Sequence, residues 1–284
     1  MQIKSVGVIG LGTMGSGITQ VAAHHGREVI GVERDEAAVE AAWRRVRDGY
    51  ARTAARGKMT DAQVEEALGR ITIVTDLAAV AGTDLVVDAV FEDVELKRNL
   101  LGEIDRLVPQ ETLIASNTST IPLVILAGAT SRPERVVGLH FFNPVPAMRL
   151  VEVIKTPVTL EETVEALRRF AVELGKDPVI VNDVPGFVGN LLIVPYLRDA
   201  IRAYERGVAP MESIDAVIKL GFNHPMGPFA LSDLIGLDIV HDMAASMYEE
   251  YKEPRYFPPT LLKQYVRLGW LGRKTGRGFY TYAT

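Results

Sequence analysis

The stretch SVGVIGLGTMGSGITQ, residues 5–20, decides the fold because it joins a β-rich run, a glycine-rich turn and the start of a helical pattern. Gly10, Gly12 and Gly15 have the spacing GxGxxG. Between a strand and a helix, such glycines let the backbone turn tightly and let a pyrophosphate approach the positive helix N-terminus. The sequence therefore predicts a dinucleotide-binding turn, whose expected contact residues are Gly10, Leu11, Gly12, Thr13, Met14 and Gly15.

An acid ends the next β-rich run, Glu28 to Glu33, about 20 residues after the glycines. A carboxylate at this place can accept hydrogen bonds from both ribose hydroxyls and would repel a 2′-phosphate, so the sequence favours NAD over NADP. Arg34 follows and could stack on the adenine or pair with that phosphate, which keeps NADP open as the alternative. The order of strand, turn, helix and acid disfavours the view that the glycines only ease packing.

The chain up to about residue 184 alternates strand-like and helical runs. A charged helical region is expected over Asp35–Leu68 with a break near Gly57, and another helix over Glu95–Leu107. Further strands are expected at residues 71–74, 84–90, 112–117, 135–141 and 150–154. This alternation predicts an α/β fold, a Rossmann-type doubly wound parallel sheet covered on both faces.

From Pro185 onward the strand-like runs vanish and helical stretches take over. Helices are expected at Leu191–Glu205, Met211–Leu220 and Leu234–Glu250. The sequence therefore predicts two domains, an NAD-binding Rossmann domain over residues 1–184 and a smaller all-α C-terminal domain over residues 185–284 for substrate binding and dimerisation.

Composition narrows the class of protein. The 284 residues are 48% hydrophobic and 24% charged, which is typical of a globular chain long enough for two cores. A net charge of -5 without a dense run of Lys and Arg disfavours a nucleic-acid partner. The absence of Cys excludes disulfides, thiolate catalysis and Cys-ligated zinc, and the His residues never form HExxH, so no metal is expected. No secretory signal pattern opens the chain, and the expectation is a cytoplasmic protein with no membrane partner.

A second informative stretch is GLHFFNPVPAMRLVEVI, residues 138–154. His140 falls near the end of a predicted strand, and residues 143–146, Asn-Pro-Val-Pro, cannot continue a sheet ladder. An extended run resumes at Leu150, so the chain is expected to turn back and bring Glu152 beside His140. An unpaired carboxylate among apolar residues is costly to bury, and His140 is the nearest candidate partner.

A His–Glu pair beside a nicotinamide cofactor suits alcohol oxidation. Removing hydride from carbon requires removal of the hydroxyl proton, which is work for a base that titrates near neutrality. The glutamate would fix the ring tautomer and stabilise the imidazolium as it forms. A histidine at a strand end is more often structural when taken alone. The catalytic interpretation gains weight here because open α/β sheets bind ligands beyond the carboxyl ends of their strands.

The order of motifs along the chain resembles the 3-hydroxyacyl-CoA dehydrogenases. The motifs are GLGTMGSGI, FEDVELKR, ASNTST, GLHFFNPVPAMRLVEVI, PGFVGN, IVPYL, HPMGPF and GRKTGRGFY, and HFFNPV is far more specific than the glycine spacing. The resemblance covers essentially the whole chain and is strongest to the short bacterial 3-hydroxybutyryl-CoA dehydrogenases. It implies reversible, NAD-dependent oxidation of a short (S)-3-hydroxyacyl-CoA to the 3-oxoacyl-CoA.

The resemblance also implies roles for individual residues. His140 would be the general base with Glu152 as its partner. Ser119 would hydrogen-bond the substrate oxygen near the nicotinamide, and Asn190 would donate to the reacting oxygen or to the thioester carbonyl. Without the resemblance, Ser119 would be interpreted as a loop or helix-capping serine and Asn190 as a helix cap.

Further cofactor and substrate contacts follow from the same resemblance. NAD contacts are expected from Glu92, Lys97, Asn143 and Lys274. Taken alone, Glu92 would be a solvated acid at a helix start, Lys97 an exposed lysine and Lys274 part of a flexible glycine-rich tail. The coenzyme A phosphates are expected to meet the charged helical region at Arg52, Arg56 and Lys58. A homodimer built through the C-terminal helices is the family's arrangement.

Two alternatives stay open at this point. One is a dehydrogenase of a free hydroxy acid or sugar acid, as in the gulonate dehydrogenase branch, which needs no coenzyme A site. The other is a structural protein like the related lens crystallins, against which the presence of both His140 and Glu152 argues. The chain departs from the family where it reads Gly189-Asn190-Leu191 in place of Val-Asn-Arg, which loses an arginine, and where Glu33-Arg34 stands in place of an aspartate. Acyl-chain length, direction and pathway (fatty-acid breakdown, butanoate metabolism or polyester turnover) are open.

Overall fold

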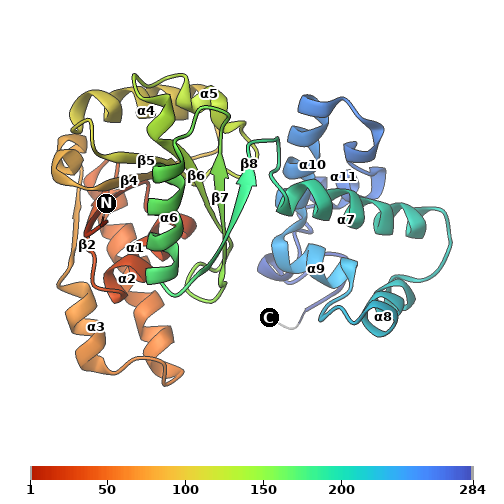
Figure 1. The fold of residues 1–284 in the computed structure, drawn as a ribbon. Coiled ribbons are helices and arrows are strands. Elements are labelled where there is room, and N and C mark those ends of the chain that lie inside the picture. Colours follow the sequence, from red (N-terminus) through yellow and green to blue (C-terminus); the bar gives the residue numbers. More distant parts are fainter. Residues whose placement is uncertain (1, 283–284) are drawn as a thin grey trace. The chain divides into compact units, whose positions relative to one another are not determined.

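The computed structural model describes residues 2–282. The chain divides into two compact units, with the change from one to the other between Val184 and Pro185 (Figure 1). The first unit is an α/β sandwich around one sheet, and the second is helical. The predicted fold class, a Rossmann-type sheet followed by a smaller all-α unit, is therefore confirmed.

The sheet of the first unit has eight strands in the order β3-β2-β1-β4-β5-β6-β7-β8. The strands from β3 to β6 are parallel to one another, β7 is antiparallel to β6, and β8 is parallel to β7. In such sheets, ligands bind at the carboxyl ends of the strands where the order reverses, here between β1 and β4. The strands are β1 (Ser5–Ile9), β2 (Glu28–Val32), β3 (Ile71–Val74), β4 (Leu85–Asp88), β5 (Leu113–Ser116), β6 (Val136–Phe141), β7 (Leu150–Lys155) and β8 (Asp177–Asn182).

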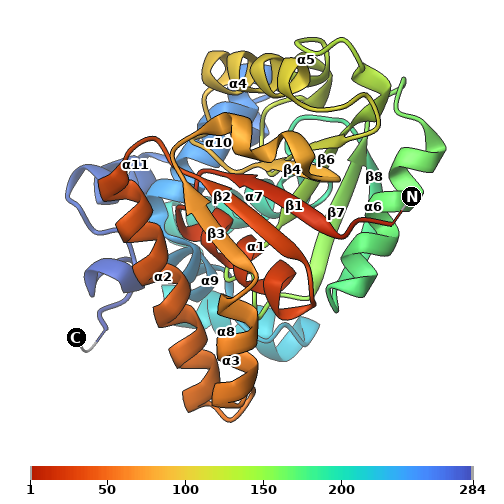
Figure 2. The ribbon, with the colours of Figure 1, turned by 90° about the vertical axis from the view of Figure 1, so that its left-hand side faces the viewer.

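Helices cover both faces of this sheet (Figure 2). The helices α1, α2 and α6 share one apolar core with strand residues such as Val6, Val87 and Leu139. The helices α4 and α5 pack against each other on the other face. The predicted break in the charged region lies at Gly57, whose φ of 67° favours glycine. The helices are α1 (Thr13–His24), α2 (Glu36–Ala55), α3 (Asp61–Leu68), α4 (Val94–Leu107), α5 (Leu123–Ala127) and α6 (Glu161–Glu173), with 3₁₀ turns η1 (Leu77–Gly82) and η2 (Pro133–Arg135).

The strand β8 was missed by the sequence reasoning. It contains Pro178, which lacks an N–H donor and argues against a strand in the interior of a sheet. At the end of the strand order, β8 pairs only with β7, and an edge strand tolerates proline.

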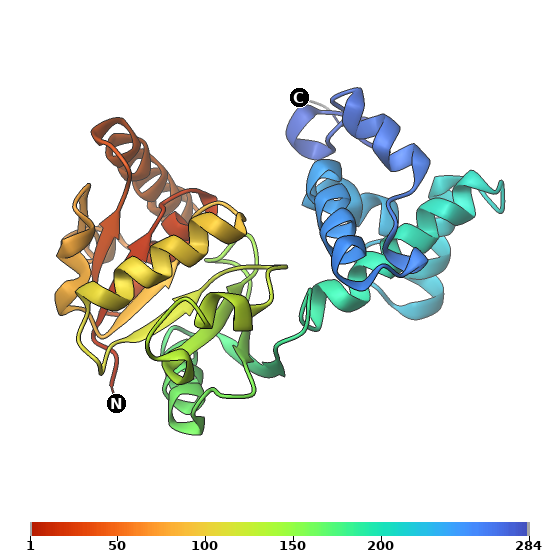
Figure 3. The same cartoon turned by 90° about the horizontal axis from the view of Figure 1, so that it is seen from above.

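The second unit is built of helices (Figure 3). The single helix predicted over Leu234–Glu250 is wrong, because Gly236 with a φ of 110° separates α9 from α10. The helix α11 was not predicted. The helices are α7 (Gly189–Glu205), α8 (Met211–Phe222), α9 (Pro228–Ile235), α10 (Leu237–Tyr251) and α11 (Thr260–Arg267), with 3₁₀ turns η3 (Pro254–Tyr256) and η4 (Arg273–Thr275).

Within residues 2–282, no helix is long and apolar enough to cross a membrane. Nor do these residues hold a group of three or more His, Cys, Asp or Glu side chains that could bind a metal ion.

Candidate active site

The glycine turn between β1 and α1 has the geometry of an anion-binding loop. Gly10 has a φ of 82°, in the region that favours glycine. A Cβ at Gly15 would lie 1.9 Å from the Gly10 carbonyl oxygen, so α1 could not approach the turn with a side chain there. A Cβ at Gly12 would meet nothing within 4 Å, so there is open space in front of the helix. The N-terminal amides of α1, at Thr13 and Met14, have no partner within a helix and favour an anion in that space.

Glu33, directly after β2, is tied to this turn. Its Oε1 accepts a hydrogen bond from the Leu11 N–H at 2.7 Å, so the acid stands beside the glycines. Arg34 is directed elsewhere, since its side chain is 81% exposed and its Nε donates to Asp35 at 3.1 Å. The turn and the acid together fit an adenosine diphosphate group.

His140 and Glu152 face each other across the antiparallel pair β6 and β7. The distance between His140 Nδ1 and Glu152 Oε2 is 2.8 Å, and both residues are buried. Side chains directly opposite on one face of such a pair are neighbours, so the contact follows from the register. When Glu152 is ionised it can only accept a hydrogen bond, which places the hydrogen on Nδ1 and leaves the lone pair on Nε2. The pair has the arrangement of a general base with an orienting acid.

The turn after β5 carries Ser119 and is fixed to its neighbours by Asn117. The Asn117 side-chain oxygen accepts from the Phe141 N–H at 2.9 Å, directly after His140 on β6. The Asn117 N–H donates to the Asp88 carbonyl oxygen at 2.8 Å. The Ser119 turn is therefore anchored to the ends of both β4 and β6.

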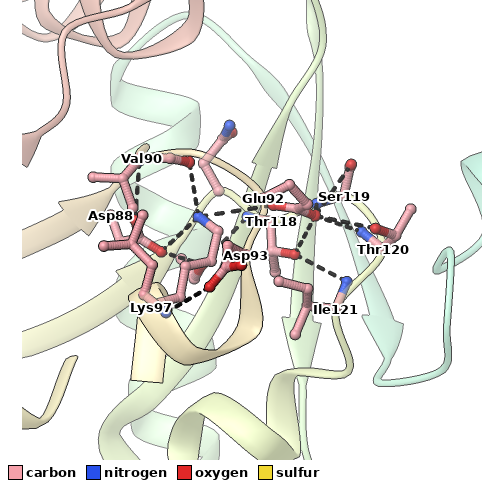
Figure 4. A network of polar contacts seen from close by, with 12 residues as sticks. Asp88, Val90, Glu92, Asp93, Lys97, Thr118, Ser119, Thr120 and Ile121 are labelled. Carbon is pink, nitrogen blue, oxygen red and sulfur yellow. Dashed lines mark hydrogen bonds and ion pairs between the residues drawn. The ribbon is translucent and has the colours of Figure 1, made fainter. Parts of the chain in front are cut away.

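Glu92 organises this turn (Figure 4). Its Oε1 accepts from Thr118 Oγ1 at 2.6 Å, from the Ser119 N–H at 2.8 Å and from the Thr120 N–H at 3.0 Å. Burial alone would raise the pKa of Glu92, but the Lys97 charge and these hydrogen bonds outweigh it and hold the pKa below its usual 4.5. Glu92 is thus an acid at the start of α4 whose side chain, still 34% exposed, is also held by hydrogen bonds from the turn.

Lys97 is not the exposed lysine that the sequence alone suggests. It is 1% exposed, and its Nζ donates to Asp88 Oδ2 at 2.8 Å and to the Val90 carbonyl oxygen at 3.1 Å. The same Nζ lies 3.8 Å from Glu92 Oε2. Sequence reasoning missed Asp88, although an acid that ends the apolar run Leu85–Asp88 requires a partner.

A cavity of about 470 Å³ lies between α1, α2 and the loop from β6 to β7. Arg52 and Arg56 line it from α2 and its C-terminal end, and Asn143 lines it from the loop, together with Thr13 at the start of α1. Lys58 is not among the lining residues. A larger cavity of about 620 Å³ between α2 and α3 is lined by none of the predicted site residues.

The second unit holds Asn190 and Lys274. Asn190 is buried in the first turn of α7, but the N-cap position belongs to Val188, so the interpretation of Asn190 as a cap is wrong. Lys274 Nζ donates to Asp238 Oδ2 at 2.6 Å. The segment around Lys274 is folded rather than a flexible tail, because Gly272 and Thr281 both pair with Arg277.

Both units of this chain resemble known proteins. The family model for the 3-hydroxyacyl-CoA dehydrogenase NAD binding domain matches residues 5–184, and the model for the 3-hydroxyacyl-CoA dehydrogenase C-terminal domain matches residues 186–282. A 3-hydroxybutyryl-CoA dehydrogenase of Mycobacterium tuberculosis is 47% identical over 282 residues, 99% of each chain. The crystal structure of (S)-3-hydroxybutyryl-CoA dehydrogenase from Ralstonia eutropha is 42% identical with a TM-score of 0.93 and full coverage of both chains. A diketoreductase structure is 33% identical with a TM-score of 0.91 and covers 99% of this chain and 100% of its own.

Proposed function

This chain belongs to the 3-hydroxyacyl-CoA dehydrogenase family, and on that basis we propose that it reversibly oxidises (S)-3-hydroxybutyryl-CoA to acetoacetyl-CoA with NAD. The observation that carries the proposal is the buried contact between His140 and Glu152 at the carboxyl end of β6, in a unit that is an NAD-binding domain. Oxidation of an alcohol needs a base beside a hydride acceptor, and this pair supplies the base.

His140 accepts the proton of the substrate hydroxyl on Nε2 while the C3 hydrogen leaves as hydride, so that the carbon becomes a carbonyl carbon. NAD bound at the glycine turn supplies the hydride acceptor. Glu152 holds the Nδ1 hydrogen at 2.8 Å and stabilises the imidazolium that forms. In the reductive direction, the imidazolium returns the proton to the oxygen.

Ser119 is the proposed hydrogen-bond donor to the reacting oxygen. Its hydroxyl donates to Glu92 Oε1 at 3.3 Å in the structure and would turn from there to the substrate oxygen. The family resemblance implies that Asn190, in the second unit, donates to the reacting oxygen or to the thioester carbonyl, where negative charge develops in the transition state. Glu92 and Asn143 contribute to the nicotinamide side of the cofactor site, and Lys97 acts there by holding Glu92, because its own side chain is buried. For Lys274 the family resemblance implies a cofactor contact.

The cavity beside α2 is the proposed site of the coenzyme A phosphates. Arg52 and Arg56 line it, and arginine forms charge-assisted, bidentate hydrogen bonds with phosphate oxygens. Lys58 follows on the α2–α3 connection and does not line the cavity. Coenzyme A at 100 times its Kd should stabilise the protein against urea by about 2.7 kcal/mol. Arg56→Met should lose most of this protection, and the control Arg106→Met, an exposed arginine on α4, should keep it.

The alternative is a free-acid substrate. The 33% identical diketoreductase is a relative whose name mentions no coenzyme A ester. Urea protection by coenzyme A distinguishes the two, because an enzyme for free hydroxy acids has no use for a phosphate-binding cavity. Equal urea midpoints with and without coenzyme A would favour the free-acid alternative.

The role of His140 is tested by His140→Gln. Turnover of acetoacetyl-CoA with NADH should fall by roughly 10²- to 10⁴-fold, which is the usual contribution of a positioned base. The affinity for NADH should stay within about twofold, because the glycine turn is unchanged. His241→Gln, at a partly exposed histidine in the second unit, is the matched control. Turnover of His140→Gln near that of the control would show that another group moves the proton.

A homodimer through the second unit is also part of the proposal. Along α8 only Met211 and Asp215 are buried, while Val217, Leu220 and Phe222 are between 61% and 86% exposed. Val217 and Leu220, three positions apart, share one face of α8, and an exposed apolar face of this kind marks an interaction surface. In sedimentation velocity, Leu220→Glu should shift the protein from dimer to monomer. Val124→Glu, on α5 of the first unit, should not, and two variants that sediment alike would contradict the assignment of α8.

A further inference from the structure

We propose that Asp88 is a positioning residue, which fixes the Ser119 turn through Lys97 and Glu92 on one route (Figure 4) and through Ser116 on another. The inference rests on the proposed function, in which Ser119 contacts the substrate oxygen. The Asp88 side chain is fully buried and reaches the turn only through other side chains.

Asp88 ends β4 and has a polar partner at every side. Its Oδ1 accepts from the Val90 N–H at 3.0 Å, and its Oδ2 accepts from Lys97 Nζ and from Ser116 Oγ, each at 2.8 Å. Asp88 lies opposite Ser116 in the register of β4 and β5, so the contact with Ser116 is fixed by the sheet. A buried carboxylate with these partners has one stable position, because any other would leave a buried ammonium group unpaired.

The first route runs through Lys97 to Glu92. The Lys97 ammonium group lies between two carboxylates, 2.8 Å from Asp88 and 3.8 Å from Glu92. Glu92 uses Oε2 toward this ammonium group and Oε1 toward the Ser119 turn. Without the Asp88 charge, Glu92 is the nearest carboxylate to a buried cation. The cation would then draw Glu92 closer and weaken its bonds to the turn.

The second route runs through Ser116 to Thr118. Ser116 Oγ donates to Asp88 and accepts from the Thr118 N–H at 3.3 Å. Thr118 Oγ1 in turn donates to Glu92 and accepts from the Ile121 N–H at 3.1 Å. Both routes therefore end on the same turn, on either side of Ser119.

Amide hydrogen exchange tests this inference without any need for turnover. In Asp88→Asn, which keeps the shape and removes the charge, the Ser119 and Thr120 amides should exchange at least about tenfold faster than in the wild type. Asp105→Asn is the matched control, because Asp105 pairs with buried Arg132 in the same unit and does not contact the turn. Unchanged exchange at both amides in Asp88→Asn would overturn the inference. Should Asp88→Asn fail to fold, Ser116→Ala interrupts the second route alone and should speed the same amides by a smaller factor.

A double-mutant cycle tests whether Asp88 acts through Ser119. Asp88→Asn should lower kcat by about tenfold or more when Ser119 is present, and by less than about twofold in a Ser119→Ala background. Equal losses in both backgrounds would overturn the inference, since a general structural defect would act on both. If Ser119→Ala turns over as fast as the wild type, Ser119 does not contact the substrate and the inference about Asp88 is refuted. The proposed role of His140 would be unaffected. A wild type without turnover would refute the proposed function, and the exchange rates would still decide on Asp88.

Discussion

The substitution Glu152→Gln removes one negative charge and almost no volume from the proposed base. Glu152 Oε2 lies 2.8 Å from His140 Nδ1, and the residue Glu152 is only 2% exposed, so little water screens the contact. A hydrogen bond to a charged group contributes about 1.5 to 3 kcal/mol, and this stabilisation is largest when the imidazole becomes charged in the transition state. At 1.36 kcal/mol for each factor of ten, kcat should fall by roughly 10- to 150-fold.

The assay is the oxidation of NADH by acetoacetyl-CoA, with NADH affinity measured separately by fluorescence. The affinity should stay within about twofold, because Glu152 lies on β7 and the glycine turn follows β1. Glu152→Asp keeps the charge but shortens the side chain and should also lose activity, since the contact depends on reach as well as charge. A kcat for Glu152→Gln equal to that of the wild type would refute the pairing argument.

Three other predictions follow from particular contacts. Gly12→Ala should leave the melting temperature unchanged and weaken NADH binding at least about tenfold, because the added Cβ enters only the open space at the N-terminus of α1. The control Gly82→Ala, whose surroundings are equally open, should change neither the melting temperature nor NADH binding. Arg132→Met should lower the free energy of unfolding in urea by about 3 to 5 kcal/mol, since it leaves the Asp105 carboxylate and three carbonyl oxygens without their buried guanidinium partner; a loss under 1 kcal/mol would contradict this. The pKa of Glu92 in the folded protein lies below 4.5, so the wild type should have a larger free energy of unfolding than Glu92→Gln above that pH. This difference should vanish as the pH falls through the lowered pKa, and a difference that grows in acid would contradict the lowered pKa.

Much of the first unit could be predicted because its signals are local. The sequence patterns of the glycine turn, the apolar strands and the alternating helices can each be recognised within about ten residues. The contact between His140 and Glu152 could also be predicted, because two prolines in residues 143–146 stop the sheet ladder and force an antiparallel return.

The missed features depend on distant parts of the chain. Lys97 appeared to be an exposed helix residue because its partner, Asp88, belongs to another element, and only the packed structure shows that the two are buried together. The same holds for the hydrogen bonds from the Ser119 turn to Glu92, which join segments separated by a whole helix and strand. The strand β8 was hidden by Pro178, whose tolerance depends on a position at the sheet edge.

The most direct test of the central claim is the rate of NADH oxidation with acetoacetyl-CoA, measured beside NADPH and beside free acetoacetate. The proposed function predicts rapid turnover with NADH and acetoacetyl-CoA, and little with either NADPH or the free acid. In this proposal Glu33, beside the glycine turn, binds the ribose, and the cavity lined by Arg52 and Arg56 takes the coenzyme A phosphates. Turnover of free acetoacetate as fast as that of its coenzyme A ester would contradict the proposed substrate. The absence of turnover in every combination would contradict an NAD-dependent dehydrogenase of short 3-hydroxyacyl-CoA substrates.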